Sequence, residues 1–479
     1  MLDQSRKLFV GPRLKRLRRE RNLSQARMAE ELGLSPSYLN LIERNQRPVT
    51  AQVLIRLVHA YGLDPREFAT DDDERAASEL EEIFADPLFR NAPVARLELR
   101  ELVESAPSVA DAVSRLYRAY VGLRGATELT GPSVSDRDRA EDAPQDSPVE
   151  RVRALVHEAR NHFPELDEGA EALASELQLT GHDLFFAIAE RLRAKHGIRV
   201  RVMPIDVMSD SLRRYDHHRR QLSISELVDQ PGRMFQAAYQ LAFAEMRETI
   251  DGLATRLEPA DGPARRLLRI SLGNYFAGAL MMPYGRFHAA AESLGYDIEV
   301  LRARFGASFE QIAHRLTTLA RPGLKGIPFF LVRVDAAGNV SKRFSSGRFP
   351  FSRFGGTCPL WNVHATFAVP GQIVTQIIEL PDTTRWFSIA HAVKRASTPW
   401  GAAERQFVVG LGCELKYAHR LVYARGRDLS APDATPIGIN CRLCERPACP
   451  QRAAPPLTRT LVVDEMTRGI SPFVFDNAR

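Results

Sequence analysis

The sequence predicts a multidomain, mainly α-helical protein with an α+β C-terminal half, and three observations support this fold class. The chain has 479 residues, and because a domain typically has about 100 to 200 residues, we expect more than one domain. Apolar residues recur at helical spacing from Leu14 to about Leu123 and again, with a β-like interruption, from Pro148 to about Arg321. Between residues 327 and 380 apolar and polar residues instead alternate around a Gly-Asn turn, which is typical of β-strands.

The composition excludes several classes of protein. With 44% hydrophobic and 26% charged residues, the chain is neither fibrous nor mostly disordered. It has no apolar run of about 18 residues and begins without the apolar core of a signal peptide, so we expect a cytoplasmic protein. Five cysteines are too few for a disulfide framework in so long a chain, which leaves them as thiols or metal ligands.

The excess positive charge is concentrated at the start of the chain. Residues 1–50 contain 11 lysines and arginines against 5 acidic residues, whereas the rest of the chain contains 54 of each. A basic segment joined to a neutral remainder is typical of a nucleic-acid-binding module attached to other domains.

Short helices with recognisable caps are predicted in this basic region. Ser24 can cap a second helix, and Ser35 followed by Pro36 combines an N-cap with proline at the first helical position. Thr50 can cap a fourth helix. Residues 13–63 match the length of a five-helix DNA-binding unit.

The segment SQARMAEELGLSPSYLNLIERNQRPVT resembles the phage-repressor-like (XRE) helix-turn-helix family, which has a lambda-repressor-like fold. In this family the second helix lies on the DNA backbone, and the start of the third reaches base edges in the major groove. We therefore assign residues 1–70 as an XRE-type DNA-binding domain for double-stranded operator DNA. By position, Ser37, Tyr38 and Asn40 would read bases, and the expected phosphate contacts are Gln25, Arg44 and Arg47. A helical bundle with a solvated basic face is the alternative interpretation.

Two segments separate this domain from the rest of the chain. Residues 71–126 are predicted to be a helical connector, and they could supply the helices of a homodimer or higher homo-oligomer because two DNA half-sites match a two-fold protein. Residues 127–148 are polar and contain three prolines, which predicts a linker.

Residues 149–321 are predicted to form an α+β domain with a β-like stretch at 198–202 and a hairpin through 213–224. Two of its predicted helical segments resemble signatures of regulatory zinc peptidases of the IrrE (M78) type, which have a zincin-like fold. In that family one helix supplies two zinc-binding histidines, which share a helix face at positions i and i+4, and a general-base glutamate. Here Tyr239 and Phe243 stand at the histidine positions, Gln240 replaces the glutamate, and the acidic third ligand is replaced by Ile270 or Leu272. The resemblance therefore implies the fold without metal ligands and without catalytic residues.

A cleft that has lost its metal ligands keeps apolar and hydrogen-bonding groups, which are typical of a small-molecule pocket. The alternative interpretation is that Tyr239 and Phe243 are ordinary core residues on an apolar helix face.

Residues 322–479 are predicted to be a β-rich C-terminal domain with a cysteine site. Cys441, Cys444 and Cys449 lie within nine residues, and Cys358 lies upstream in a glycine-rich turn. Four thiolates can hold tetrahedral zinc or an iron–sulfur cluster. Proline follows two of these cysteines, as it follows the last cysteine of bacterial ferredoxin runs, and this favours a 4Fe-4S cluster over zinc.

Two further residues bear on this site. His364 is a possible substitute ligand, and Cys413, in apolar helix-like text, is expected to be a buried thiol. Free, unligated cysteines remain the alternative interpretation of the whole group.

The order of these parts, together with the tail I-G-I-N-C-R-x-C-x-R-x-x-C-x-Q-R-A at residues 437–453, is similar to the short-chain fatty acyl transcriptional regulator family. Members regulate genes of propionate, propionyl-CoA, acetate and glyoxylate metabolism. The resemblance therefore implies a DNA-binding transcriptional regulator, and not an enzyme, with a short-chain acyl-CoA effector such as propionyl-CoA.

A bound acyl-CoA requires cations for its phosphates and an apolar slot for its acyl end. The expected phosphate clamps are Arg160, Arg193 and Arg201, although solvated surface arginines are the simpler interpretation. The expected walls of the slot are Tyr239, Phe243 and Tyr284. Two other functions stay open at this point: a redox sensor that uses the cysteine site as its input, and a zinc peptidase that cleaves a repressor.

Overall fold

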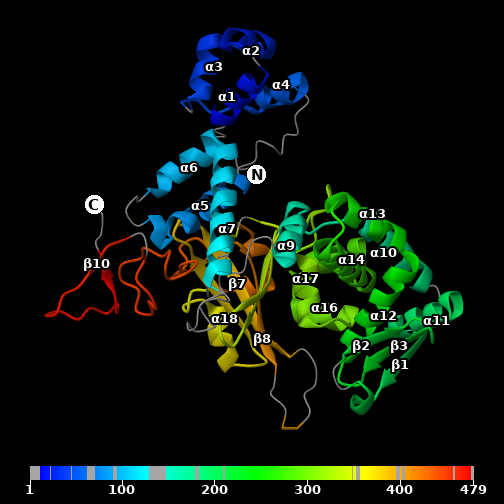
Figure 1. The fold of residues 1–479 in the computed structure, drawn as a ribbon. Helices are drawn as coiled ribbons and strands as arrows, with labels where there is room; N and C mark the ends of the chain where they lie inside the picture. Colours follow the sequence, from blue (N-terminus) through cyan, green and yellow to red (C-terminus); the bar gives the residue numbers. More distant parts are fainter. Residues whose placement is uncertain are drawn as a thin grey trace. The chain divides into compact units, whose positions relative to one another are not determined.

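The structure is a computed structural model (Figure 1). It describes residues 11–21, 23–44, 46–61, 71–89, 94–128, 147–178, 183–208, 211–347, 349–351, 357–394, 400–401, 405–456 and 459–475. The chain divides into two compact units, Met1–Val134 with Leu457–Thr460, and Ser135–Pro456 with Leu461–Arg479. Across these described residues, no helix combines the length and apolar character needed to cross a bilayer.

The first unit begins with four short helices around a small core. These helices are α1 (Gly11–Glu20), α2 (Gln25–Leu32), α3 (Pro36–Glu43) and α4 (Ala51–Tyr61). The predicted caps are confirmed, because the Ser24 hydroxyl accepts from the Arg27 N–H and the Ser35 hydroxyl from the Tyr38 N–H, each at 3.1 Å. The last two residues of the predicted five-helix unit, 62 and 63, lie outside the described residues.

The core of this helix-turn-helix is formed by apolar side chains from all four helices and from the segment before α4. Its fully or nearly fully buried members are Leu14, Met28, Ala29, Leu32, Leu39, Ile42, Val49, Val53 and Leu57. The turn between α2 and α3 passes through Gly33, whose φ of 64° lies in the left-handed region that favours glycine. Gly33 thus allows the short turn that joins the two helices of the motif.

Three further α-helices lie in the described part of the first unit. They are α5 (Asp71–Phe84), α6 (Arg96–Ser105) and α7 (Pro107–Glu128), with the one-turn helix η2 (Pro87–Phe89) after α5. Leu80, Ile83, Leu99 and Val103 form a separate apolar core among them. Helices are therefore present where the connector was predicted, whereas residues 129–146 of the predicted linker lie outside the described residues.

The second unit begins with a helical part that carries a small sheet. The helices are α9 (Pro148–Glu158), α10 (Pro164–Gln178), α11 (Leu184–His196), α12 (Gln230–Glu245), α13 (Arg247–Leu257), α14 (Pro263–Met281), α15 (Tyr284–Ser293), α16 (Ile298–Phe305) and α17 (Phe309–Leu316). The strands are β1 (Arg199–Met203), β2 (Arg213–Asp216) and β3 (Gln221–Ser225), and the one-turn helix η4 (Ile205–Val207) follows β1. The strand order is β1-β3-β2, with β1 parallel and β2 antiparallel to β3. Both the predicted strand and the predicted hairpin are confirmed.

The β-rich part of the second unit is built on a six-stranded sheet. Its strands are β4 (Phe330–Asp335), β5 (Val340–Ser345), β6 (Ile373–Glu379), β7 (Arg385–Lys394), β8 (Gln406–Glu414) and β9 (Thr435–Pro436), in the order β5-β4-β8-β7-β6-β9. All neighbours are antiparallel except β6 and β9. The expectation of helix-like structure around Cys413 is wrong, because this residue lies in β8. A short apolar run fits a buried strand as well as a helix.

Shorter elements surround the sheet. They are α18 (Asn362–Ala365), η5 (Thr366–Ala368), η6 (Leu415–Arg420), η7 (Val422–Ala424), and the two-stranded pair β10 (Leu461–Val462) and β11 (Val474–Phe475).

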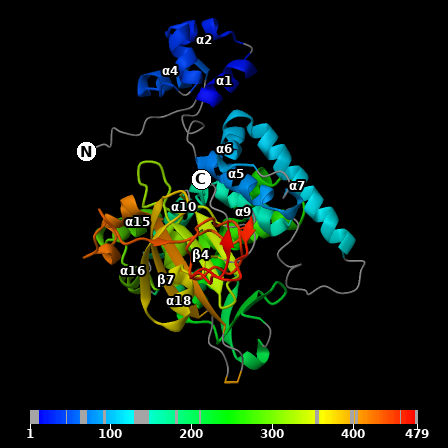
Figure 2. The ribbon, with the colours of Figure 1, turned by 90° about the vertical axis from the view of Figure 1, so that its left-hand side faces the viewer.

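The six-stranded sheet separates two apolar cores. Successive side chains of a strand point to opposite faces. Leu331, Phe387 and Leu411 accordingly join the core of the helical part, whereas Phe330 and Trp386 join a second core with the loop before α18. Figure 1 shows α16 and α17 on one side of β7 and β8 with α18 on the other, and Figure 2 is viewed from the α18 side. The sheet thus has the helical domain on one face and the loop that carries Cys358 on the other.

Candidate functional sites

The predicted DNA-reading residues occupy α2, α3 and the turn that follows α3. Gln25 donates through Nε2 to Oδ1 of Asn40 at 3.3 Å and to Oε2 of Glu43 at 2.9 Å. The nearly buried Glu43 carboxylate also accepts from Nε of Arg18 at 2.6 Å and from Nη2 at 3.1 Å. One carboxylate therefore fixes α1 and α2 to α3, and it brings a predicted phosphate contact beside a predicted base reader.

The other predicted DNA contacts remain accessible. Ser37, Arg44 and Arg47 are exposed, as a DNA-contacting face requires. Tyr38 is only half exposed, because its ring packs partly against the core of the helix-turn-helix. The base-reading and phosphate-contacting roles stay predictions.

In the helical part of the second unit, the two aromatic residues at the former histidine positions form a closed pair. The rings of Tyr239 and Phe243 on α12 lie 5.0 Å apart between centroids. A Cβ placed on Gly273 of α14 would lie 2.5 Å from Cε2 of Phe243 and 3.0 Å from Cε2 of Tyr239. The rings therefore lie directly on the glycine backbone, and only glycine leaves them room. Aromatic side chains occupy the space between α12 and α14 where a zincin-like fold would hold its metal.

A guanidinium group lies over one ring of this pair. The Cζ atom of Arg213, at the start of β2, lies 4.4 Å from the centroid of the Tyr239 ring. Burial lowers the pKa of Arg213 and raises the pKa of Tyr239. Among the described residues no carboxylate pairs with Arg213. By contrast, Arg269, which lies over the Phe243 ring, pairs with Asp251 at 2.6 Å. Arg213 is thus a half-buried cation without a counter-charge.

Sequence reasoning missed Arg213. The signal that could have identified it is its position at the start of the predicted hairpin, since β3 of this hairpin contacts α12.

The predicted phosphate clamps lie elsewhere. Arg160 is exposed, with a φ of 51° in the turn after α9. Arg193 is exposed and paired with Glu190 at 2.5 Å, and Arg201 is exposed on the edge strand β1. The cations that the structure brings to the aromatic pair are Arg213 and Arg269 instead.

Tyr284, the third predicted wall, is fully buried at the start of α15. Its hydroxyl accepts from the Arg321 N–H and donates to the Leu324 carbonyl, each at 2.9 Å. The Arg321 guanidinium lies 4.0 Å from the centre of its ring. These contacts place Tyr284 in a second polar cluster, and none of them involves Tyr239 or Phe243.

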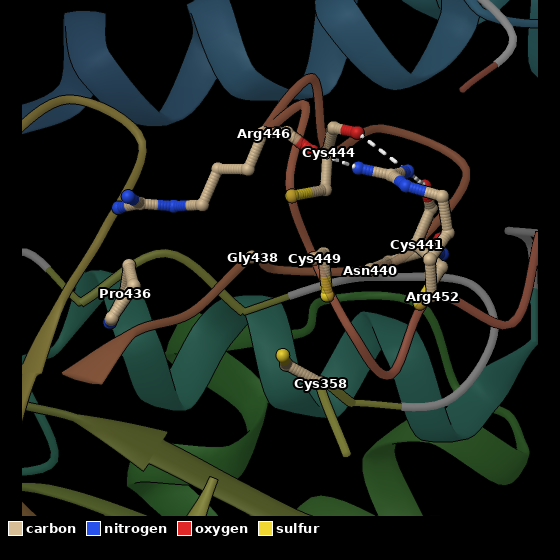
Figure 3. A pocket seen from close by; sticks show the side chains of 9 residues that line it. All are labelled: Cys358, Pro436, Gly438, Asn440, Cys441, Cys444, Arg446, Cys449 and Arg452. Atoms are coloured by element: carbon tan, nitrogen blue, oxygen red, sulfur yellow. Dashed lines mark hydrogen bonds between the residues drawn. The ribbon is translucent and has the colours of Figure 1, made fainter. Parts of the chain in front are cut away.

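The four predicted ligand cysteines lie around one hollow, which we call the cysteine hollow. It has about 280 Å³ of empty volume, part of it open to solvent. Its lining residues are Cys358, Pro436, Gly438, Asn440, Cys441, Cys444, Arg446, Cys449 and Arg452. Figure 3 shows the four cysteines around it, and in this view the sulfur atoms of Cys358 and Cys449 face each other.

Backbone pairing positions the cysteine-bearing segment. Strand β9 pairs with the end of β6, and the Ile437 N–H extends this pairing by donating to the Glu379 carbonyl at 2.9 Å. A Cβ on Gly438 would lie 2.7 Å from Cβ and 2.8 Å from Sγ of Cys444, so the thiol lies on the glycine backbone. The Arg442 N–H then donates to Oδ1 of Asn440 at 2.7 Å, which turns the chain at the first cysteine of the motif.

The chemistry of the hollow fits a soft metal group, since thiolates select zinc and iron–sulfur clusters. Burial raises the pKa of Cys358, and the proximity of Cys441 and Cys444 raises it further. A cation would reverse this effect by stabilising the thiolates. In the described residues, however, no three His, Cys, Asp or Glu side chains have the geometry of a metal site. The cysteines therefore converge without being arranged as ligands.

The two other residues considered for this site lie apart from it. His364 does not line the hollow, and its Nε2 lies 2.7 Å from the hydroxyl oxygen of Thr357. Cys413 is fully buried, as expected, and belongs to the core on the helical side of the sheet.

A helix-turn-helix joined to a zincin-like domain with aromatic residues in place of metal ligands defines the class of this protein. It is a helix-turn-helix transcriptional regulator. The family models for "Helix-turn-helix", "IrrE N-terminal-like domain" and "Short-chain fatty acyl coenzyme A regulator, C-terminal" match residues 14–68, 193–317 and 318–473. The chain belongs to the short-chain fatty acyl coenzyme A regulator family.

Similar proteins cover nearly the whole chain. RamB of Mycobacterium tuberculosis, an HTH-type transcriptional regulator, is 42% identical over 98% of this chain and 99% of its own. The propionyl-CoA carboxylase regulator of Cereibacter sphaeroides is 39% identical over 98% and 99%. A solved Mycobacterium tuberculosis transcriptional regulator aligns with a TM-score of 0.65 and 40% identity, covering 68% of this chain and 99% of that one.

Proposed function

We propose that this protein controls genes of short-chain acyl-CoA metabolism by binding an acyl-CoA, with propionyl-CoA as the effector, in its zincin-like domain. The family's name and the relative named as a propionyl-CoA carboxylase regulator support the metabolite class. The protein binds double-stranded operator DNA through α3 as a homodimer, because a two-fold protein matches two half-sites.

The observation that carries this proposal is the group formed by Arg213, Tyr239 and Phe243. An unpaired, half-buried guanidinium is a strong partner for a phosphate oxygen. The neighbouring aromatic rings supply apolar surface for an acyl chain if they separate from Gly273. The expected phosphate clamp is therefore Arg213 rather than the exposed Arg160, Arg193 or Arg201.

Tyr239 and Phe243 also disfavour the peptidase alternative. Neither side chain offers zinc a ligand near neutral pH, and Gln240 cannot act as a general base. We propose that the domain binds its ligand without cleaving it.

The effector acts through the packing of the second unit. The helical part shares one continuous core with the six-stranded sheet, so a ligand that separates α12 from α14 changes the surface presented to this sheet. A ligand shifts such an equilibrium only by its different affinity for the two packings. The change then alters how paired helix-turn-helix domains match their operator.

The cysteine hollow supports a second input. We propose that Cys358, Cys441, Cys444 and Cys449 hold a 4Fe-4S cluster, with zinc as the alternative. A bound cluster would supply one-electron redox chemistry. The four cysteines would hold the group, and a change in its oxidation state would make DNA binding sensitive to oxidants.

Isothermal titration of the full chain with propionyl-CoA tests the effector. We expect binding to the wild type, and at least about tenfold weaker binding to Arg213→Gln, because a hydrogen bond to a charged group contributes about 1.5–3 kcal/mol. The matched control is Arg219→Gln, which removes an 80% exposed arginine of the same hairpin. No heat with folded wild type at near-millimolar ligand would contradict the proposal.

Operator titrations in the presence and absence of propionyl-CoA, and separately of an oxidant, distinguish the two inputs. Acyl-CoA sensing predicts that Arg213→Gln loses only the first response. Loss of both responses in this variant would point to a single input at the cysteine hollow.

A further inference from the structure

Arg452 is a buried arginine that lines the cysteine hollow. Its side chain is 4% exposed, and its guanidinium lies 4.9 Å from the centre of the Phe475 ring in β11, which covers it. Arginine is rarely buried without paired charge. Among the described residues no carboxylate pairs with it, so its position requires another explanation.

The guanidinium holds the backbone of the cysteine motif. Nη1 donates to the carbonyls of Cys441 at 3.3 Å, Cys444 at 2.9 Å and Ala454 at 3.4 Å, and Nη2 donates to the carbonyl of Arg446 at 2.5 Å. The segment that carries two of the thiols is therefore wound around this one group (Figure 3).

A second arginine attaches this wound segment to the sheet. Nη2 of Arg446 donates to the carbonyls of Glu379 at 2.8 Å and Leu380 at 2.9 Å, and its Nε donates to the carbonyl of Ile437 at 3.3 Å. Because Arg446 attaches the cysteine-bearing segment to the end of β6, this attachment does not depend on Arg452. The side chain of Arg452 lines the hollow instead.

One donor of Arg452 has no acceptor among the described residues. Its Nε–H is buried and makes no hydrogen bond, although it belongs to a side chain that lines the hollow. A buried, unmade hydrogen bond costs about 1–3 kcal/mol, so such groups normally have a partner. The other groups that line the hollow include four sulfur atoms, which accept hydrogen bonds well when they are thiolates bound to a metal.

We propose that Arg452 is a positioning residue for the metal–thiolate group, with Nε–H as a hydrogen-bond donor to sulfur and its charge as a partial counter-charge. This inference rests on the proposed cluster site. A buried positive charge stabilises the more negative, reduced form of a cluster and therefore raises its reduction potential. The same side chain, through its carbonyl contacts, holds the backbone of the segment that carries Cys441 and Cys444.

The test compares Arg452→Gln and Arg452→Lys with wild type. The matched control is Arg442→Gln, which removes the exposed arginine of the same motif, whose side chain is not part of the hollow. Each full-length protein is reconstituted anaerobically with ferrous iron and sulfide, and separately with Zn²⁺. The measurements are metal retention against a chelator, the midpoint potential of the cluster, and circular dichroism to confirm folding.

We expect Arg452→Gln to bind metal about 10- to 100-fold more weakly, which is the usual effect of losing a hydrogen-bonding partner of a metal ligand. Its midpoint potential should be more negative than that of wild type. Arg452→Lys keeps the charge but cannot contact several carbonyls at once, so it should also lose metal readily while its potential stays nearer to wild type. A purely structural role would leave the potentials of these two variants equal.

Equal retention and equal potential in Arg452→Gln and Arg442→Gln would overturn the inference while leaving the cluster proposal intact. If the wild type takes up zinc but no cluster, zinc retention in Arg452→Gln and Arg442→Gln is compared instead, and equal retention would overturn the inference. A folded wild type that takes up neither metal contradicts the cysteine site itself, and the role of Arg452 with it.

Discussion

Asp167 and Arg315 form an ion pair in the interior of the helical part of the second unit, with Nη2 of Arg315 2.7 Å from Oδ1 of Asp167. The side chain of Arg315 is 2% exposed and that of Asp167 is 0% exposed. The Tyr275 hydroxyl donates to Oδ2 of Asp167 at 2.7 Å, and Arg315 donates to the Met282 carbonyl and the Thr318 hydroxyl, each at 3.0 Å. Burial alone raises the pKa of Asp167, but the charge of Arg315 and the hydrogen bonds from His162, Tyr275 and Arg315 outweigh it and hold that pKa below its usual value. The carboxylate therefore stays ionised inside the protein.

Asp167→Ala should lower the free energy of unfolding by about 3–5 kcal/mol, because removing one partner leaves a buried charge uncompensated. Urea denaturation of the full chain measures the change. The control is Glu299→Ala, which breaks the exposed pair with Arg302 and should cost less than about 1 kcal/mol. Equal losses in the two variants would show that the buried pair does not stabilise the domain.

Substituting Gly273 and Gly278 by alanine separates the close packing of α14 from its helix propensity. A Cβ at Gly273 would overlap the Phe243 ring, whereas a Cβ at Gly278 would meet no atom within 4 Å. We expect Gly273→Ala to cost about 1–3 kcal/mol of stability through overpacking. Gly278→Ala should gain about 0.5–1 kcal/mol, since alanine loses less backbone entropy in a helix. Thermal denaturation checks both signs, and a gain in both variants would mean that the aromatic pair is not held against α14.

The lowered pKa of Glu245 should make the free energy of unfolding depend on pH. Burial alone raises its pKa, but hydrogen bonds from Arg191, His196 and Lys195 lower it from 4.5 to about 2. Because the folded-state pKa lies below the unfolded one, the carboxylate contributes stability that is complete above about pH 4.5 and is lost as the pH falls toward about 2. The difference in free energy of unfolding between wild type and Glu245→Gln should therefore be larger at about pH 7 than at about pH 3. A difference that does not change with pH would contradict this reasoning.

Substitutions of the predicted DNA-contacting residues should weaken DNA binding in two different ways. Arg44→Ala should weaken binding to all DNA sequences alike and reduce the slope of log affinity against log salt by about 0.9, because one phosphate contact is lost. Asn40→Ala should instead relax discrimination at one base pair by about 1–3 kcal/mol. Fluorescence anisotropy titrations at several salt concentrations measure both, with Arg219→Ala as the control in the second unit. An unchanged salt slope in Arg44→Ala would place that arginine away from the phosphates.

The sequence predicted best the features that depend on neighbouring residues. The caps at Ser24 and Ser35 were predictable because an N-cap acts on a backbone N–H three residues away. The hairpin that ends at Ile224 was predictable from alternation over a few residues. The convergence of Cys358 on the C-terminal thiols was predictable for another reason, since three closely spaced thiols in a loop have few structural uses and a four-thiolate site needs one more ligand.

Contacts between distant segments were not predictable in this way. Asp167 and Arg315 are 148 positions apart, and no local pattern indicates their pairing. Arg213 was missed because its unpaired state depends on which side chains α12 and α14 bring to it. The β-structure of Cys413 was missed because an apolar run lacks the polar alternation that distinguishes a half-buried strand from a helix.

The order of the cysteines along the chain has a consequence for how the protein matures. Cys358 comes before β6, β7 and β8, whereas the other three thiols follow β9, so an atom bound by all four would cross-link the two ends of a segment that folds as most of the sheet. Such a link could close only after the last thiol has left the ribosome and β9 has paired. Losing it would leave the strand pairing of the sheet complete, and the chain beyond β9 would still be attached to the end of β6 by the hydrogen bonds of Arg446.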